Sequence, residues 1–220
     1  MTTLTRDLLE DAFTELGRRA LGEGKTIDLA VYGGSALILA TNFRAATADV
    51  DAVAQLDQAT VDRLAGDIAR ERNWSADWLN DGVRTFLSPN VASVEAHHHL
   101  FRAYPDEANQ GLRVFVPSVE YMTALKLAAL RIDPVRGEKD RDDIKNLLAI
   151  CNIKTADAAM DFVAKFFPEY ERTSRLYPRF HAQFTSFFQQ GIEPPIQPIY
   201  NPGSSAEASM VSPGSRKDAP

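Results

Sequence analysis

Two short motifs of this sequence carry groups that could do chemistry together. The first is Gly33-Gly34-Ser35, which lies between a β-prone run and an apolar stretch expected to be helical. Glycine lets backbone N–H groups approach a ligand closely, and the N-terminus of a helix offers unpaired N–H donors and a positive dipole end. The Ser35 hydroxyl adds a further donor. This motif predicts a phosphate-binding turn.

The second motif is the pair Asp49 and Asp51, which flank Val50. Alternate residues of a strand point to the same side of the sheet, so we expect both carboxylates on one face. Two neighbouring carboxylates repel each other unless a cation lies between them. Mg²⁺ takes one or two carboxylates together with substrate phosphates. We therefore predict that Asp49 and Asp51 bind Mg²⁺ (or Mn²⁺) beside a phosphate, an arrangement suited to phosphoryl or nucleotidyl transfer.

Each motif alone also has an ordinary explanation. Gly-Gly-Ser is usually just a turn, and Asp-x-Asp is usually the solvated face of a strand; only their combination and order favour the functional interpretation. The consecutive His97, His98 and His99 diverge on any regular element and lack the spacing of metal ligands. The single cysteine, Cys151, is expected to be a buried small apolar side chain.

The elements that must position these motifs follow from the spacing of apolar residues. The sequence predicts a helix that begins at Ser35, between strands over residues 27–32 and 49–54. Further strands are expected over 83–87 and 112–116. The other expected helices cover residues 5–22, 57–71, 118–131, 139–151, 155–167 and 173–189. This order predicts an α+β protein.

We expect three parts along the chain. Residues 1–117 would form a small mixed-sheet α+β head, and residues 118–190 a C-terminal helical region that completes a cleft with it. Residues 191–220 hold half of the prolines of the chain, together with serine and glycine and almost no aromatic residues. Such a segment buries too little apolar area to offset its ordering entropy, so it is predicted to be a disordered tail.

Composition excludes several classes of protein. The 220 residues, 45% hydrophobic and 25% charged, are typical of a globular protein of one domain, or of one domain plus an appendage. A net charge of −6 argues against a general nucleic-acid coat, which needs a clustered positive surface. No apolar run approaches the ~20 residues of a membrane span, no signal pattern opens the chain, and one cysteine forms no internal disulfide. We expect a cytoplasmic protein without a membrane partner.

Two blocks of the sequence resemble a known family. Residues 31–37 (Val-Tyr-Gly-Gly-Ser-Ala-Leu), followed by Arg44, Thr47 and Asp49-Val50-Asp51, resemble the nucleotidyltransferase fold of the DNA polymerase β superfamily. The likeness is to its subgroup of AbiEii-type and MenT-type bacterial nucleotidyltransferases. Residues 121–131 look like the lysine-bearing helix of that group, and residues 139–148 look like its Lys/Arg-Asp-x-x-Asp-apolar helix. The resemblance covers about residues 5–190.

The resemblance implies a role for each matching position. Asp49 and Asp51 would bind the metal and be catalytic, and a triphosphate would be bound by Gly33, Gly34, Ser35, Arg44 and Thr47.

The second block would supply a lysine and a further acid. Lys126 would contact phosphate as a catalytic residue, and Asp140 or Asp143 would complete the site. From the residues alone, a lysine inside an apolar helix can also extend to solvent. Acids near a helix start can simply favour the helix dipole.

Two departures from the family pattern concern the charges of the site. Arg44 lies one residue farther from Asp49 than is usual in the group. The expected strands over 83–87 and 112–116 carry Arg84 and Arg113 and no acid where the superfamily has a third carboxylate. Either an acid of the 139–148 helix takes this place, or metal binding is weakened.

The resemblance implies an enzyme that transfers a nucleotide from an NTP to an acceptor hydroxyl and releases pyrophosphate. The acceptor stays open among tRNA, a protein side chain and a small molecule. A toxin with an antitoxin or regulatory partner is a narrower form of this hypothesis and depends on analogy. The alternative is a catalytically degenerate nucleotide-binding or partner-binding module of the same fold.

Overall fold

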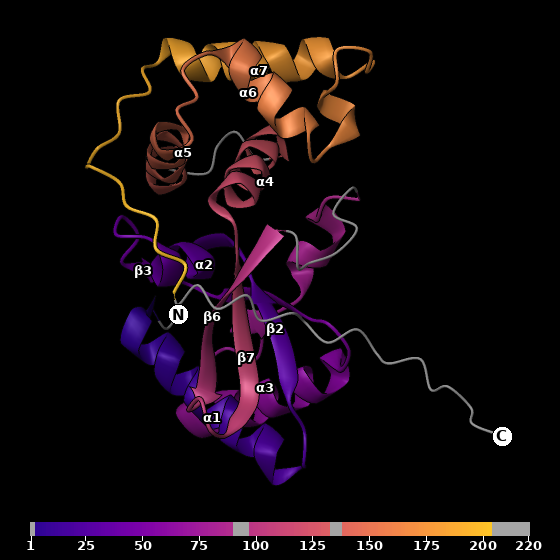
Figure 1. Ribbon diagram of the computed structural model, residues 1–220, viewed down its shortest axis with the longest axis vertical. Coiled ribbons are helices and arrows are strands. Elements are labelled where there is room, and N and C mark those ends of the chain that lie inside the picture. The colour runs from indigo at the N-terminus through magenta and orange to yellow at the C-terminus, as the bar shows by residue number, and fades with distance from the viewer. Residues whose placement is uncertain (1–2, 90–96, 133–137, 204–220) are drawn as a thin grey trace, which may run out of the picture.

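The computed structural model describes residues 3–89, 97–132 and 138–203. Its centre is a mixed five-stranded sheet of order β5-β4-β2-β7-β6, with helices packed against it (Figure 1). The strands are β2 (Ile27–Val31), β4 (Val50–Ala54), β5 (Leu79–Asn80), β6 (His98–Pro105) and β7 (Gln110–Pro117). A separate two-stranded sheet joins β1 (Leu4–Thr5) to β3 (Ala46–Thr47). The protein is therefore of the mixed α and β class that the sequence predicts.

The central strand β2 has an antiparallel neighbour on one side and a parallel one on the other. It pairs antiparallel with β4, so that Val31 lies opposite Ala52, and parallel with β7. The edge strand β5 is parallel to β4, and β6 forms an antiparallel hairpin with β7. The end of β2 and the start of β4 therefore lie side by side, which brings the two motifs together.

The helices form two groups. The first group is α1 (Arg6–Gly22), α2 (Gly33–Ala40) and α3 (Gln58–Arg72). The second group is α4 (Val119–Ile132), α5 (Glu138–Ile150), α6 (Ala156–Ala164) and α7 (Tyr177–Gln189), which gather at one end of the molecule (Figure 1). The described part of the chain has no helix with both the length and the apolar character that membrane crossing requires.

Alternate residues of β2 belong to two different hydrophobic cores. Leu29 and Val31 belong to the core shared with α1, α2 and α3. Ala30 belongs to the other core, as does Tyr32 directly after the strand, together with apolar side chains of α4–α7. This alternation follows from the two-residue period of a strand that is buried on both faces.

Helix α1 lies directly on the β6–β7 hairpin at two glycines. A Cβ atom built on Gly111 of β7 would lie 1.9 Å from the carbonyl oxygen of Gly17. A Cβ atom built on Gly17 would lie 2.6 Å from the carbonyl oxygen of Tyr104 in β6. The helix and the hairpin are therefore in backbone-to-backbone contact, which only glycine at both positions permits.

The segment between α3 and β7 differs from the prediction. The expected strand over 83–87 is instead the 3₁₀ helix η1 (Gly82–Phe86). Local polar groups explain this, because the Gly82 N–H donates to Asn80 Oδ1 at 3.0 Å and the Arg84 N–H donates to the Asp81 carbonyl at 2.9 Å. Strand β6 was not predicted, and its register against β7 shifts between Leu100 and Arg102. Such an irregularity interrupts the alternation from which a strand is recognised.

Residues 191–203 also differ from the prediction, which assigned them to a disordered tail. They return from α7 to the end of α2, where the Asn201 N–H donates to the Ala40 carbonyl at 2.7 Å. The Tyr200 hydroxyl donates to the Pro117 carbonyl at 2.6 Å, and the Ile199 N–H donates to Asn42 Oδ1 at 2.8 Å. These hydrogen bonds and the burial of the half-buried Tyr200 ring offset the conformational entropy that residues 191–203 lose on ordering. The prediction from composition did not include these contacts. Residues 204–220 lie outside the described residues.

Candidate functional site

Gly33 joins β2 to α2 in a conformation that suits only glycine. Its φ angle is +60°, in the left-handed region that other residues rarely adopt. A Cβ atom at this position would lie 2.6 Å from Oδ2 of Asp51. The backbone conformation and the neighbouring carboxylate therefore both require glycine, and they place Asp51 against the first turn of α2.

Gly34 is the contact point of a second segment. A Cβ atom at Gly34 would lie 2.7 Å from Oγ1 of Thr47 and 3.5 Å from Nη2 of Arg44. The N-cap residue Tyr32 makes no side-chain hydrogen bond to the first turn of α2. Thr47 and Arg44 are thus beside the turn, and their binding of a phosphate, which only the resemblance implies, stays a prediction.

The two aspartates come from the start of β4. Val50, Ala52 and Ala54 are buried on one face of this strand, whereas Asp51 is half-buried and Asp49, directly before the strand, is exposed. The Tyr32 N–H donates to the Asp51 carbonyl at 2.8 Å. This hydrogen bond fixes the register of β4 against the end of β2. It therefore accounts for the position of Asp51 beside the turn.

The Ser35 hydroxyl has a different partner from the phosphate that we expected. Its side chain is completely buried and donates to the carbonyl of Asp49 at 2.7 Å. This bond fastens α2 to the residue that precedes β4. The Ser35 hydroxyl therefore holds the two motifs together.

Lys126 of α4 lies in a cluster of balanced charges. Its Nζ is 2.8 Å from Asp140 Oδ1 and 3.0 Å from Asp143 Oδ2, and Nη1 of Arg44 is 2.7 Å from the same Asp143 oxygen. The Asp143 side chain is only 3% exposed. Burial raises the pKa of its carboxyl group, and the neighbouring Lys126 and Arg44 oppose this by favouring the carboxylate. Asp143 of α5 thereby connects Lys126 of α4 with Arg44, which lies in the loop beside the turn.

The structure shows Asp140 and Asp143 as partners of cations, and neither is shown beside Asp49 and Asp51. Their role as an additional acid stays a prediction. Arg113 of β7, where a third carboxylate was sought, forms a two-point ion pair with Asp28 at 2.6 Å and 2.7 Å. Arg113 therefore stabilises the pairing of β7 with β2.

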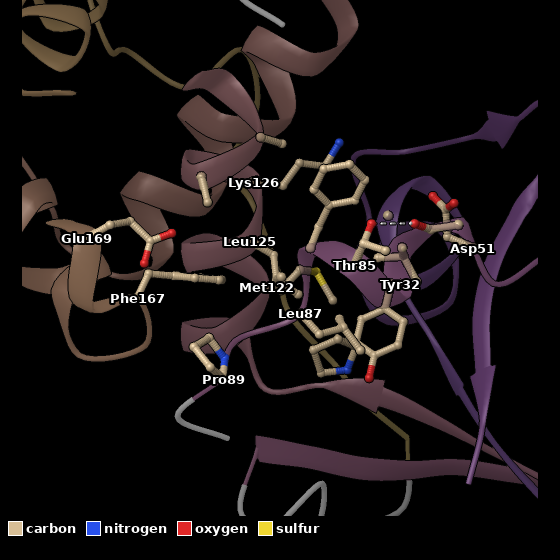
Figure 2. A pocket seen from close by; sticks show the side chains of 17 residues that line it. Tyr32, Asp51, Thr85, Leu87, Pro89, Met122, Leu125, Lys126, Phe167 and Glu169 are labelled. Carbon is tan, nitrogen blue, oxygen red and sulfur yellow. Dashed lines mark hydrogen bonds between the residues drawn. The ribbon is translucent and has the colours of Figure 1, made fainter. Parts of the chain in front are cut away.

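A pocket of ≈ 470 Å³ opens between the sheet and the helical region. Gly33 and Asp51 line it from the head, and Lys126 lines it from α4, so the pocket joins the two predicted motifs (Figure 2). The further lining residues named in Figure 2 are Tyr32, Thr85, Leu87, Pro89, Met122, Leu125, Phe167 and Glu169.

Several residues that line the pocket were not recognised from the sequence. Phe86 lines the pocket from η1 and is 51% exposed, an unusual exposure for a phenylalanine. Glu169 comes from η3 (Pro168–Tyr170), which lies far along the chain from both motifs. No spacing rule connects these segments, because they meet only through the packing of α4–α7 on the head.

Two of the three consecutive histidines, His97 and His98, pack against aromatic side chains, whereas His99 is exposed. His98 is buried, and its Nε2 lies 3.0 Å from the Tyr32 hydroxyl. The rings of His97 and Tyr121 are 5.8 Å apart. Burial raises the pKa of the Tyr32 hydroxyl, which keeps this group protonated beside the pocket.

One carboxylate of the predicted metal pair, that of Asp51, lies at the turn. Among the described residues, no group of three or more His, Cys, Asp or Glu side chains is arranged to hold a metal ion. Mg²⁺ commonly needs only one or two carboxylates, with phosphates and water as its other ligands. Asp49 is exposed directly before β4 and is not among the residues that line the pocket, so only the Asp51 carboxylate is shown at the turn. The binding of Mg²⁺ by the two aspartates stays a prediction.

No protein-family model, no curated protein and no solved structure matches this chain. The contacts of the turn, the aspartates and the pocket therefore carry the functional proposal.

Proposed function

We propose that the protein is a Mg²⁺-dependent nucleotidyltransferase, which moves a nucleotide from an NTP to an acceptor. The main support is the position of the Asp51 carboxylate, 2.6 Å from the Cβ position of Gly33 at the first turn of α2. A helix N-terminus favours a phosphate, and a carboxylate beside it would repel that phosphate unless a cation lay between them. This juxtaposition favours a cation and a phosphate bound together.

Each residue of the site has a specific task in this proposal. The backbone N–H groups of Gly33 and Gly34 donate to the triphosphate, and Arg44 and Lys126 add positive charge. Asp49 and Asp51 hold Mg²⁺, which, when bound, lowers the pKa of the acceptor hydroxyl and offsets charge on the phosphates. The acceptor oxygen bonds to the α-phosphorus, the bond to the pyrophosphate oxygen breaks, and the hydroxyl proton leaves to water.

The resemblance of the two motif blocks to the nucleotidyltransferase fold adds to this proposal. It also carries the narrower hypothesis of a toxin with an antitoxin or regulatory partner. The pocket adds independent support, because Asp51 and Lys126 line one cavity although they are distant in sequence.

A second candidate is a nucleotide-binding or partner-binding module without transferase activity. The observation that favours it is the pairing of Lys126 and Arg44 with Asp140 and Asp143, which balances their charge. In the transferase, a triphosphate would compete with these carboxylates for the two cations. Binding of an NTP without transfer would distinguish the module from the enzyme.

Metal removal tests the binding half of the proposal. We expect isothermal titration calorimetry to show at least one of ATP, GTP, CTP and UTP binding about tenfold or more tightly with Mg²⁺ than with EDTA, a difference of about 1.4 kcal/mol. The physical reason is that Asp49 and Asp51 bind the phosphates only through the cation. Titration of Mg²⁺ without nucleotide is the control and is expected to give little heat. Equal Kd values with Mg²⁺ and with EDTA would contradict the proposal.

A further inference from the structure

We propose that residues 191–203, the return segment, position the two helices that contribute Gly33 and Lys126 to the pocket. The segment runs from α7 back to the head (Figure 1). Its hydrogen bonds hold the end of α2 and the start of α4 at a fixed spacing, with Tyr200 between them. The geometry rests on those bonds, and its consequence for nucleotide binding rests on the proposed function. Tyr200 lies outside the pocket lining, so it is a positioning residue.

The C-terminal end of α2 is held by segments that are far along the chain. The carbonyl groups at this end of a helix lack partners within the helix. The Arg6 guanidinium donates to the Ile38 carbonyl at 3.3 Å and also to the Leu39 carbonyl. The Asn201 N–H of the return segment donates to the Ala40 carbonyl at 2.7 Å. These bonds fix the position of α2 along its axis.

The residues directly after α2 also bind the return segment. The Asn42 side chain donates from Nδ2 to the Gln197 carbonyl at 3.1 Å, and its Oδ1 accepts from the Ile199 N–H at 2.8 Å. Thr41 and Tyr200 form an antiparallel β-bridge. The return segment is therefore attached to the end of α2 through both its backbone and a side chain.

Tyr200 extends this attachment to the start of α4. Its hydroxyl donates to the Pro117 carbonyl at 2.6 Å. Pro117 ends β7, and α4 begins two residues later at Val119. Burial raises the pKa of the Tyr200 hydroxyl, which keeps its proton available for this bond. One residue thus joins the end of α2 to the start of α4.

The spacing of α2 and α4 decides how a nucleotide fits. A helix of 8 residues is about 12 Å long and moves as a rod, so a shift at its C-terminal end also moves its first turn. A triphosphate in contact with Gly33 of α2 and Lys126 of α4 therefore requires one spacing. The ion pair of Arg44 with Asp143 is a second link, but a bound triphosphate would compete with Asp143 for Arg44. The return segment keeps the spacing when this ion pair opens.

Two variants weaken the return segment at its opposite contacts. Tyr200→Phe removes the hydroxyl that donates to the Pro117 carbonyl and keeps the ring. Asn42→Ala removes two hydrogen bonds, and because the Asn42 side chain is exposed this variant leaves no cavity. Thr26→Val is the matched control, since the Thr26 hydroxyl donates to the Gln110 carbonyl at 2.7 Å. Gln110 begins β7 and Pro117 ends it, so the control removes a similar bond at the other end of the strand.

Hydrogen–deuterium exchange without nucleotide measures the positioning itself, at a temperature at which circular dichroism shows all the proteins to be folded. We expect faster exchange in α2 and in the first turns of α4 for Tyr200→Phe and Asn42→Ala, and the rates of the parent protein for Thr26→Val. Isothermal titration calorimetry then measures the Kd of the Mg²⁺–NTP. We expect a rise of about fivefold or more in the two variants, the scale of one hydrogen bond, and a change within about twofold in the control.

The outcomes separate this inference from the proposed function. Exchange rates in α2 and α4 that match the parent protein in both variants would overturn the inference. Faster exchange with an unchanged Kd would also overturn it, because the return segment would then stabilise the fold without positioning the site. So would an equal rise of the Kd in Thr26→Val, which would indicate a general loss of stability. If the parent protein binds no NTP, the proposed function fails, and the exchange rates alone decide whether the return segment positions α2.

Discussion

Replacing Gly111 with alanine is expected to lower the free energy of unfolding by about 3 kcal/mol or more, the upper range for overpacked positions. The added methyl group would lie 1.9 Å from the Gly17 carbonyl oxygen and 2.7 Å from Cγ of Leu21. A carbonyl oxygen in the middle of a helix cannot rotate away, so α1 as a whole would have to move off the β6–β7 hairpin. Urea denaturation followed by circular dichroism measures the effect.

The matched control is Gly66→Ala. Gly66 lies inside α3, and a Cβ atom there meets nothing within 4 Å. Alanine is favoured over glycine in a helix interior by roughly 0.5–1 kcal/mol, so this variant is expected to be more stable than the parent protein. An equal effect of the two substitutions would contradict the contact between α1 and the hairpin.

Replacing Gly33 with alanine is expected to lower nucleotide transfer by about 100-fold, the loss that a displacement of about 1 Å can cause at a reacting centre. The new Cβ atom would meet Oδ2 of Asp51 at 2.6 Å. This oxygen is the end of a side chain, so the carboxylate can rotate away and the chain can still fold. The oxygen that is proposed to bind the metal then loses its position at the turn.

Gly24→Ala controls for backbone strain alone. Gly24 has a φ angle of +68°, close to that of Gly33, but a Cβ atom there meets nothing within 4 Å. Both variants should lose about 1–2 kcal/mol of stability from the left-handed conformation. Only Gly33→Ala should lose transfer when the initial rates of labelled-product formation are compared. Similar transfer rates in the two variants would show that the position of Asp51 is unimportant.

Local patterns were sufficient to predict the elements that hold the two motifs. The run of β-prone residues before Gly33 and the alternation around Val50 predict β2 and β4, which the structure contains at Ile27–Val31 and Val50–Ala54. Apolar spacing likewise predicts α1, α3 and α4, because each helix buries one stripe of residues. These signals are strong since they depend on neighbours within a few residues.

Long-range contacts determine what the sequence did not predict. The buried bond from the Ser35 hydroxyl to the Asp49 carbonyl depends on how β4 lies beside α2. The pairing of Arg44 with Asp143 joins residues that are far apart in the chain, and so does the return of Tyr200 to Pro117. Such partners are chosen by three-dimensional packing, for which composition and periodicity carry little signal.

The most direct test of the central claim is the Mg²⁺-dependent release of pyrophosphate by the parent protein and by Asp51→Asn, measured with the four NTPs and a whole bacterial extract. Asparagine keeps the shape of aspartate and removes its charge, so the thermal unfolding temperature without nucleotide should fall little or rise. We expect Mg²⁺-dependent release by the parent protein and a loss of about 100-fold or more in the variant, the scale for removal of a group that acts on developing charge. Release that is independent of Mg²⁺, or equal in both proteins, would contradict the proposed nucleotidyltransferase.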